Sequence, residues 1–195
     1  MTYNPGGFAL SRERVRAIHP ELFGWRRVFY SRNSLDCPES ADGELGVIAD
    51  GLRDGATQPA IVVSAEPFVI AVYSDELDAV VFLRFAIELG RELRVAPRRR
   101  MVACNTYGTY PEPPCDVQLG PWWPGRFNNV RPYIADLIAT SRTAVEAKIE
   151  TIPEALWQRA WELAACWYGP TTPKRDGRPR ASWQCAYCFP YGGPT

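Results

Sequence analysis

Cysteine is the residue type in this chain whose spacing most directly suggests chemistry. Six are present, and Cys185 and Cys188 form the one C-x-x-C motif, in the segment SWQCAYCFPYGG. Such a pair can present two thiolates to Zn²⁺, with Cys104 and Cys115, at the two ends of a proline-rich loop, as further ligand candidates. Because a second C-x-x-C is missing, we expect reduced, partly buried thiols and no cofactor. Zinc binding and a disulfide or redox pair are the alternatives.

A single histidine, His19, limits the catalytic chemistry open to the chain. A three-histidine zinc site and an H-E-x-x-H motif are excluded, and a serine or cysteine nucleophile that needs histidine would have to use His19 itself. Because it lies beside Pro20 near a predicted helix end, we expect a surface or capping residue. The glycine motifs of phosphate-binding loops and the G-x-S-x-G motif are also missing.

Three carboxylates, Asp75, Glu76 and Asp78, follow the second strand of a predicted meander. Oxygen ligands of this kind can bind a divalent cation, and paired carboxylates can act as general acid and base. The segment lacks the spacing and the glycine of an EF-hand loop. Charged turn residues that face water are therefore the alternative.

The segment Pro121–Phe127 is the part of the chain most suggestive of recognition. Its prolines restrict the backbone around Trp122 and Trp123, so two indoles there would lose little entropy on binding. Trp and Arg, here including Arg126, dominate binding hot spots. The alternative is a lid that folds onto the C-terminal helices and buries both rings. The candidate binding residues are thus Asp75, Glu76, Asp78, Trp122, Trp123 and Arg126.

Charge is unevenly distributed, although the net charge is +0. Residues 33–90 hold eleven acidic side chains against Arg53 and Arg84, so the rest of the chain carries the opposite excess. Such a segment can form an acidic surface for a basic partner, or it can be neutralised by the rest of the same fold. The basic stretch Arg91–Arg100 could contact phosphates, but the zero net charge and the acidic segment argue against nucleic-acid binding.

Residues 60–85 predict three strands at the centre of the core. Residues 60–64, 68–73 and 78–85 are rich in Val, Ile, Phe and Tyr and are joined by short polar turns, which require antiparallel neighbours. Both faces of the middle strand are apolar, so we expect cover on both sides. Further elements are predicted as a helix from Ser11 to Ile18, a strand at 25–31, a helix around 45–52, and a strand at 101–107.

The C-terminal third predicts two helices that form an antiparallel hairpin over the sheet. The first begins at Asn129 as its cap, with Pro132 in the first turn, and continues to Ile149 on a 3.6-residue period. The second begins at the capping box Thr151-x-x-Glu154 and carries three tryptophans on one stripe. Residues 108–129 form an irregular excursion rich in proline and aromatic residues, and residues 169–195 a loop-like tail.

These patterns predict a single α+β domain over residues 1–195, with an antiparallel meander sheet of four to five strands under a C-terminal helical hairpin. The chain start lacks a signal-peptide pattern and no apolar run reaches about 18 residues, so we expect a soluble cytoplasmic protein outside the membrane. The sequence does not indicate an oligomeric state. The function we infer is a binding protein that presents the acidic segment 33–90 to a partner protein of basic character. An enzyme of unrecognised type using carboxylate or cysteine chemistry and a zinc-containing nucleic-acid-binding module are the alternatives.

Overall fold

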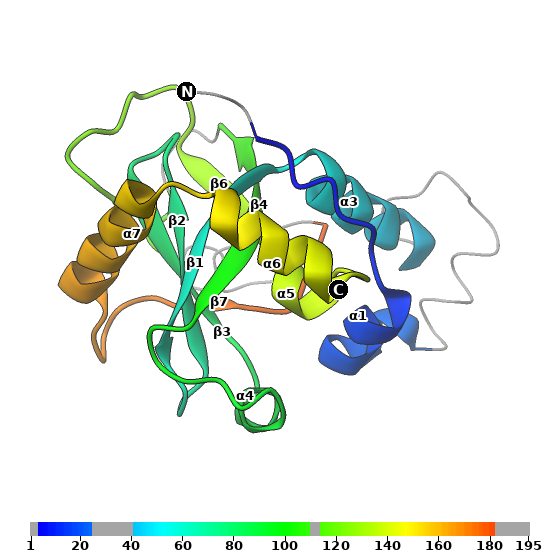
Figure 1. The fold of residues 1–195 in the computed structure, drawn as a ribbon. Coiled ribbons are helices and arrows are strands. Elements are labelled where there is room, and N and C mark those ends of the chain that lie inside the picture. The colour runs from blue at the N-terminus through cyan, green and yellow to red at the C-terminus, as the bar shows by residue number, and fades with distance from the viewer. Residues whose placement is uncertain (1–3, 25–40, 110–113, 182–195) are drawn as a thin grey trace, which may run out of the picture.

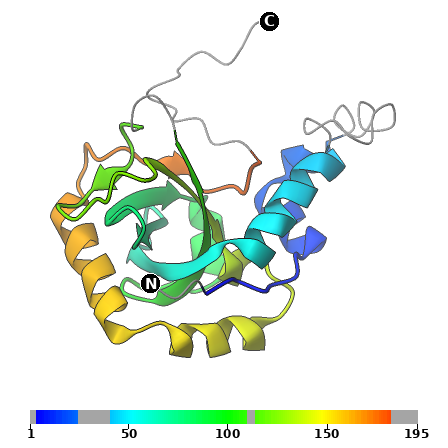
Figure 2. The ribbon, with the colours of Figure 1, turned by 90° about the horizontal axis from the view of Figure 1, so that it is seen from above.

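A strongly curled antiparallel sheet lies at the centre of the molecule, with helices around its outside (Figures 1 and 2). The computed structural model describes residues 4–24, 41–109 and 114–181. The strands are β1 (Ala56–Ser64), β2 (Val69–Ser74), β3 (Ala79–Arg84), β4 (Arg100–Gly108), β5 (Gln118–Leu119), β6 (Asn129–Ile134) and β7 (Arg175–Asp176). Their order is β5-β3-β2-β1-β4-β6, and β7 pairs in parallel with β3. The predicted α+β class with an antiparallel sheet is confirmed, although the sheet has more strands than predicted.

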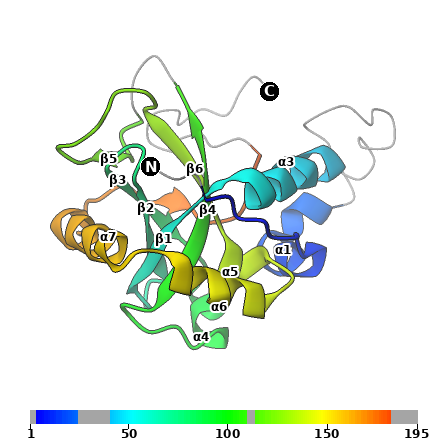
Figure 3. The same ribbon diagram turned by 45° about the horizontal axis from the view of Figure 1, so that its top comes forward.

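Helices cover the sheet from several directions (Figure 3). They are α1 (Arg12–Ile18), the 3₁₀ helix η1 (Pro20–Phe23), α3 (Ala41–Asp54), α4 (Ile87–Glu92), α5 (Ala135–Ile138), α6 (Arg142–Thr151) and α7 (Glu154–Trp167). Ser11 caps α1 through its hydroxyl oxygen, as predicted. The strand predicted at 25–31 lies outside the described residues. Within the part of the chain that the structure describes, every helix is too short or too polar to cross a bilayer.

The meander forms as the alternating pattern predicts. Val72 of β2 pairs with Ala60 of β1 on one side and with Val81 of β3 on the other. All six residues of β2 are buried, so both of its faces are covered. The inner face points into the curl of the sheet, and the outer face is packed by helices such as α7. The local period and the short turns were therefore sufficient to specify the centre of the core.

The helix predicted to begin at Asn129 is wrong over its first six residues, which form β6 and pair with β4. Val130, Tyr133 and Ile134 fit a helical stripe, but β-branched and aromatic residues also suit a strand, and β4 offers an otherwise unpaired edge. Pro132 is tolerated because β6 is an edge strand of the described sheet. The side chain of Asn129 accepts a hydrogen bond from the backbone N–H of Val130 instead of capping a helix.

The remaining helical segment divides into α5 and α6, and Ser141 caps α6. Thr151 is the last residue of α6 and donates to the Lys148 carbonyl at 2.8 Å, so the predicted capping box is wrong. The predicted C-terminal helical cover is confirmed. In Figure 2, α6 and α7 follow one another around the outside of the sheet. Helix α6 contacts β4, and α7 contacts β1, β2 and β3.

The tryptophan stripe of α7 packs in part as predicted. Trp157 is buried and Trp161 half-buried, whereas Trp167 is exposed. The guanidinium of Arg100 lies 4.9 Å from the ring centre of Trp157, and that of Arg98 lies 4.4 Å from that of Trp161. Arginines of the basic stretch therefore cover the aromatic side chains of α7, which favours packing over phosphate binding as their role.

Candidate functional site

The carboxylate of Asp78 is fully engaged inside the fold. It lies in the turn between β2 and β3 and is 5% exposed. Arg159 of α7 donates to both of its oxygens, from Nε at 2.9 Å and from Nη2 at 2.7 Å. The hydroxyl of Tyr73 donates to Oδ1 at 3.3 Å. This arrangement explains why a non-glycine residue holds a positive φ of 41° here, and it makes Asp78 a structural anchor.

The hydrogen bonds also determine the charge of Asp78. Burial pushes the pKa of its carboxyl upward, but the hydrogen bonds from Arg159 and from the Trp122 backbone, with the charge of Arg159, outweigh burial. The pKa of Asp78 therefore lies below its usual value, and the side chain stays ionised at neutral pH. A group held in this way is a poor general acid.

The same turn connects to the proline-rich excursion. The backbone N–H of Gly120 donates to the Asp78 carbonyl at 2.5 Å, and the N–H of Trp122 donates to Asp78 Oδ2 at 3.2 Å. A Cβ at position 120 would lie 2.3 Å from Asp78 Oδ2, so only glycine allows this close approach. The structure thus brings together two predicted candidate segments, the acidic turn and the tryptophan pair, that are distant in sequence.

The ring of Trp122 projects from the surface. It is 77% exposed and Trp123 is 38% exposed. Trp123 donates from Nε1 to the Phe127 carbonyl at 2.6 Å, and the Phe127 ring stacks on Tyr107 at a centroid distance of 5.4 Å. The alternative in which a lid buries both rings is therefore wrong. The backbone is held on both sides of Trp122 while its side chain meets solvent.

The two other acids of the turn differ from Asp78. Asp75 is half-buried and accepts a hydrogen bond from Gln58 Nε2, and burial raises the pKa of its carboxyl. Glu76 is half-buried and has no ion pair within the described ranges. The exposed Arg126 lies with its guanidinium 5.0 Å from the Phe127 ring centre. We call the set of Asp75, Glu76, Trp122, Trp123 and Arg126 the aromatic–acidic surface.

Part of the acidic excess of residues 33–90 is neutralised within the fold. Among the described residues, its carboxylates pair with arginines as Asp42–Arg12 at 2.9 Å, Asp50–Arg53, Asp54–Arg53 and Glu66–Arg91 at 2.7 Å, and Asp78–Arg159 at 2.7 Å. Three of the four arginines, Arg12, Arg91 and Arg159, come from outside the acidic segment. This pairing supports the alternative in which the two parts of the chain complement one another. Within the described ranges, neither Asp75 nor Glu76 has an arginine partner.

Among the described residues, the cysteine thiols and the imidazole of His19 do not form a reactive pair. Cys104 is buried, and burial raises the pKa of its thiol to about 12. Cys115 is exposed, and Cys185 and Cys188 lie outside the described residues. His19 is at the C-cap of α1, as expected, but it is buried, its Nδ1 is 3.1 Å from the Pro179 carbonyl, and burial lowers its pKa. Within the described ranges, no three His, Cys, Asp or Glu side chains are placed to share a metal ion.

Comparisons with known proteins do not assign the chain to a family. No protein-family model matches it, and neither a curated protein nor a solved structure does. Any function must therefore be argued from the site itself.

Proposed function

We propose that the protein is a cytoplasmic binding protein that recognises another protein through the aromatic–acidic surface, with Trp122 as the anchor. One observation carries the proposal: an indole that is 77% exposed stands on a backbone tied to the buried Asp78 by a 3.2 Å hydrogen bond. Large apolar side chains are normally covered when they serve only packing, as Trp157 is at 3% exposure.

The backbone of the loop around Trp122 is already held in place without a partner. Pro121 and Pro124 restrict its backbone, and the contacts of Gly120 with Asp78 and of Trp123 with Phe127 hold its two ends. A partner that buries Trp122 would therefore gain the apolar area of the ring while paying little of the usual entropy of ordering a loop. Tryptophan at the centre of an interface typically contributes about 2 kcal/mol or more.

The charge beside Trp122 indicates the chemistry of the partner. Asp78 is neutralised by Arg159, but Asp75 and Glu76 occupy the same turn, and Glu76 has no arginine partner within the described ranges. A partner protein with an apolar groove for the indole, and a basic side chain beside that groove, would match this surface. We expect the partner to be basic, as the sequence suggested. We expect it to contact the turn 75–78, however, and not the whole segment 33–90.

Co-purification with matched tryptophan variants tests this function. The tagged protein, Trp122→Ala and the control Trp167→Ala, whose ring is 42% exposed on α7, are compared by quantitative mass spectrometry of the proteins they retain. We expect a protein that the wild type and Trp167→Ala retain equally, and that Trp122→Ala loses by about tenfold or more. Glu76→Gln should weaken the same contact and reduce its dependence on salt. Identical sets of proteins on all variants would refute the proposal.

A further inference from the structure

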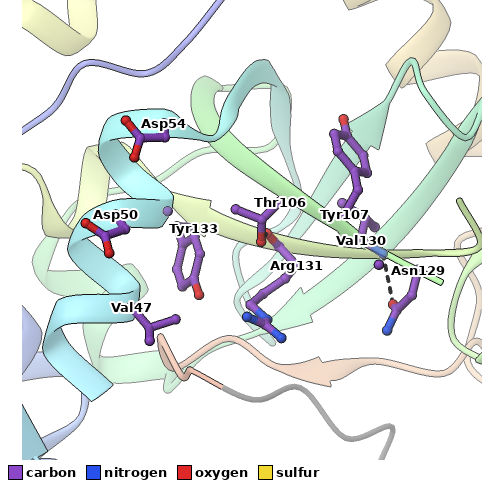
Figure 4. Close-up of a pocket in the computed structure, with 11 residues that line it drawn as sticks. Val47, Asp50, Asp54, Thr106, Tyr107, Asn129, Val130, Arg131 and Tyr133 are labelled. Atoms are coloured by element: carbon purple, nitrogen blue, oxygen red, sulfur yellow. Dashed lines mark hydrogen bonds between the residues drawn. The ribbon is translucent and has the colours of Figure 1, made fainter. Parts of the chain in front are cut away.

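A pocket separate from the aromatic–acidic surface lies between α3 and the paired strands β4 and β6 (Figure 4). Its volume is about 310 Å³. Its wall combines three charged residues, Asp50, Asp54 and Arg131, with others that include Val47, Thr106 and Tyr133. The pocket is at the lower end of the range for small-molecule sites, about 300–1,000 Å³. A ligand of one amino acid's size would fit it.

Arg131 is the unusual group in this pocket. It pairs with Thr106 across the two strands, so both side chains point from the sheet toward α3. Its Nε is buried and has no hydrogen-bond partner, and within the described ranges no carboxylate forms an ion pair with its guanidinium. Leaving a buried donor of a charged group unpaired is unfavourable for the fold. A guanidinium in this position is suited to a planar carboxylate that would take up its free donors.

A negative charge lies at the opposite side of the pocket. In Figure 4 the ring of Tyr133 lies between Arg131 and Asp50 of α3. The carboxylate of Asp50 accepts one hydrogen bond, from Arg53 at 2.7 Å, and its side chain is 62% exposed. A carboxylate has room for several further donors. The pocket therefore offers a cation and an anion to one small ligand, with an aromatic wall between them.

We propose that this pocket binds a free amino acid, with the ligand's carboxylate on Arg131 and its ammonium group on Asp50. The ligand's side chain then lies against Val47 and the ring of Tyr133. The opposite charges of Arg131 and Asp50 favour a zwitterion over a simple anion. Asp50 shares its one arginine partner, Arg53, with Asp54, so it can still accept the ammonium group of a ligand, and it repels a dianion such as phosphate.

Calorimetric titration of the full chain with each standard L-amino acid tests the proposal. We expect at least one to bind with a Kd below about 1 mM. Its carboxamide and its N-acetyl derivative should each bind about tenfold or more weakly, because each removes one of the two charges. Arg131→Met and Asp50→Asn should reproduce these two losses in the protein. The exposed Arg94→Gln is the control and should bind like the wild type.

Thermal unfolding of the same variants separates ligand binding from a structural role. Because Nε of Arg131 is unpaired, Arg131→Met should be as stable as the wild type or more stable without ligand, and it should lose the stabilisation that the amino acid provides. Failure of every amino acid to bind, equal binding of acetate or phosphate, or unchanged binding by Arg131→Met and Asp50→Asn would each overturn the proposal. None of these results depends on Trp122, so the proposed protein-binding function is tested separately.

Discussion

Arg175 holds Asp116 with two parallel hydrogen bonds, from Nε at 2.8 Å and from Nη2 at 2.7 Å, and both side chains are almost wholly buried. The same guanidinium donates from Nη1 to the carbonyl of Val130 at 2.6 Å. Arg175 belongs to β7, which pairs with β3, whereas Val130 belongs to β6 at the other end of the sheet order. The side chain thus joins the two ends of the curled sheet where backbone pairing stops.

Replacing Arg175 with Met should lower the free energy of unfolding by about 3–5 kcal/mol, because Asp116 would remain as a buried, unpaired charge. Urea denaturation followed by circular dichroism measures the change. In the double variant Arg175→Met with Asp116→Leu, a part of the loss should be recovered, since no buried charge is left alone. As a control, Arg142→Met removes an exposed pair with Glu146 and should change the stability by about 0.5 kcal/mol or less. If Arg175→Met lowered the free energy of unfolding as little as Arg142→Met does, Arg175 would not stabilise the sheet as described.

Two glycines of α3 provide a matched test of how closely this helix packs on β6. A Cβ at Gly51 would lie 2.2 Å from Cε2 of the buried Tyr133, whereas a Cβ at Gly46 would meet no atom within 4 Å. Gly51→Ala should destabilise the protein by about 1–3 kcal/mol through overpacking. Gly46→Ala should stabilise it by about 0.5–1 kcal/mol, because alanine favours the helix. The melting temperatures of the two variants should move in opposite directions, and equal shifts would refute the packing described for α3.

The low pKa of Asp78 makes one component of the stability dependent on pH. A carboxyl whose folded pKa is lowered stabilises the fold above its unfolded pKa, about 3.9 for Asp, and this contribution is lost as the pH falls through the folded value. Asp78→Asn should therefore be less stable than the wild type by about 2 kcal/mol at neutral pH, because it loses charged hydrogen bonds from Arg159.

The difference between Asp78→Asn and the wild type should shrink as the pH is lowered below about 4. Denaturation curves at several pH values measure it. Asp42→Asn, at an exposed pair with Arg12, is the control, and it should cost less than about 1 kcal/mol at neutral pH. A difference for Asp78→Asn that stayed constant with pH would show that the ionised carboxylate does not supply the stability.

The sequence predicted those elements whose signals are local. The meander followed from alternation and short turns, and Ser11 identified the start of α1. The error at Asn129–Ile134 arose because Val130, Tyr133 and Ile134 fit a helical stripe, while their β-branched and aromatic side chains also suit a strand. In that case the free edge of β4, which lies far away in the sequence, decides the structure.

The sequence offered candidate site residues by their type but could not show how they lie relative to one another. Trp122 and the acidic turn were identified by residue type, but the hydrogen bond from the Trp122 backbone to Asp78 spans 44 residues and no local pattern signals it. Arg131 was not identified at all, because an arginine in a predicted helix looks like a solvent-facing residue. Its place in the pocket became visible only when β6 placed it opposite Thr106 beneath α3.

Site-specific photo-crosslinking at position 122 tests the central claim most directly. Trp122 is replaced by a photoreactive phenylalanine analogue in the cells that make the protein, and a second variant carries the same analogue in place of the exposed Trp167. The account predicts a discrete crosslinked product with another protein at position 122 that does not form at position 167, and that weakens when Glu76 is replaced by Gln. Absence of a product at position 122, or the same product at both positions, would contradict it.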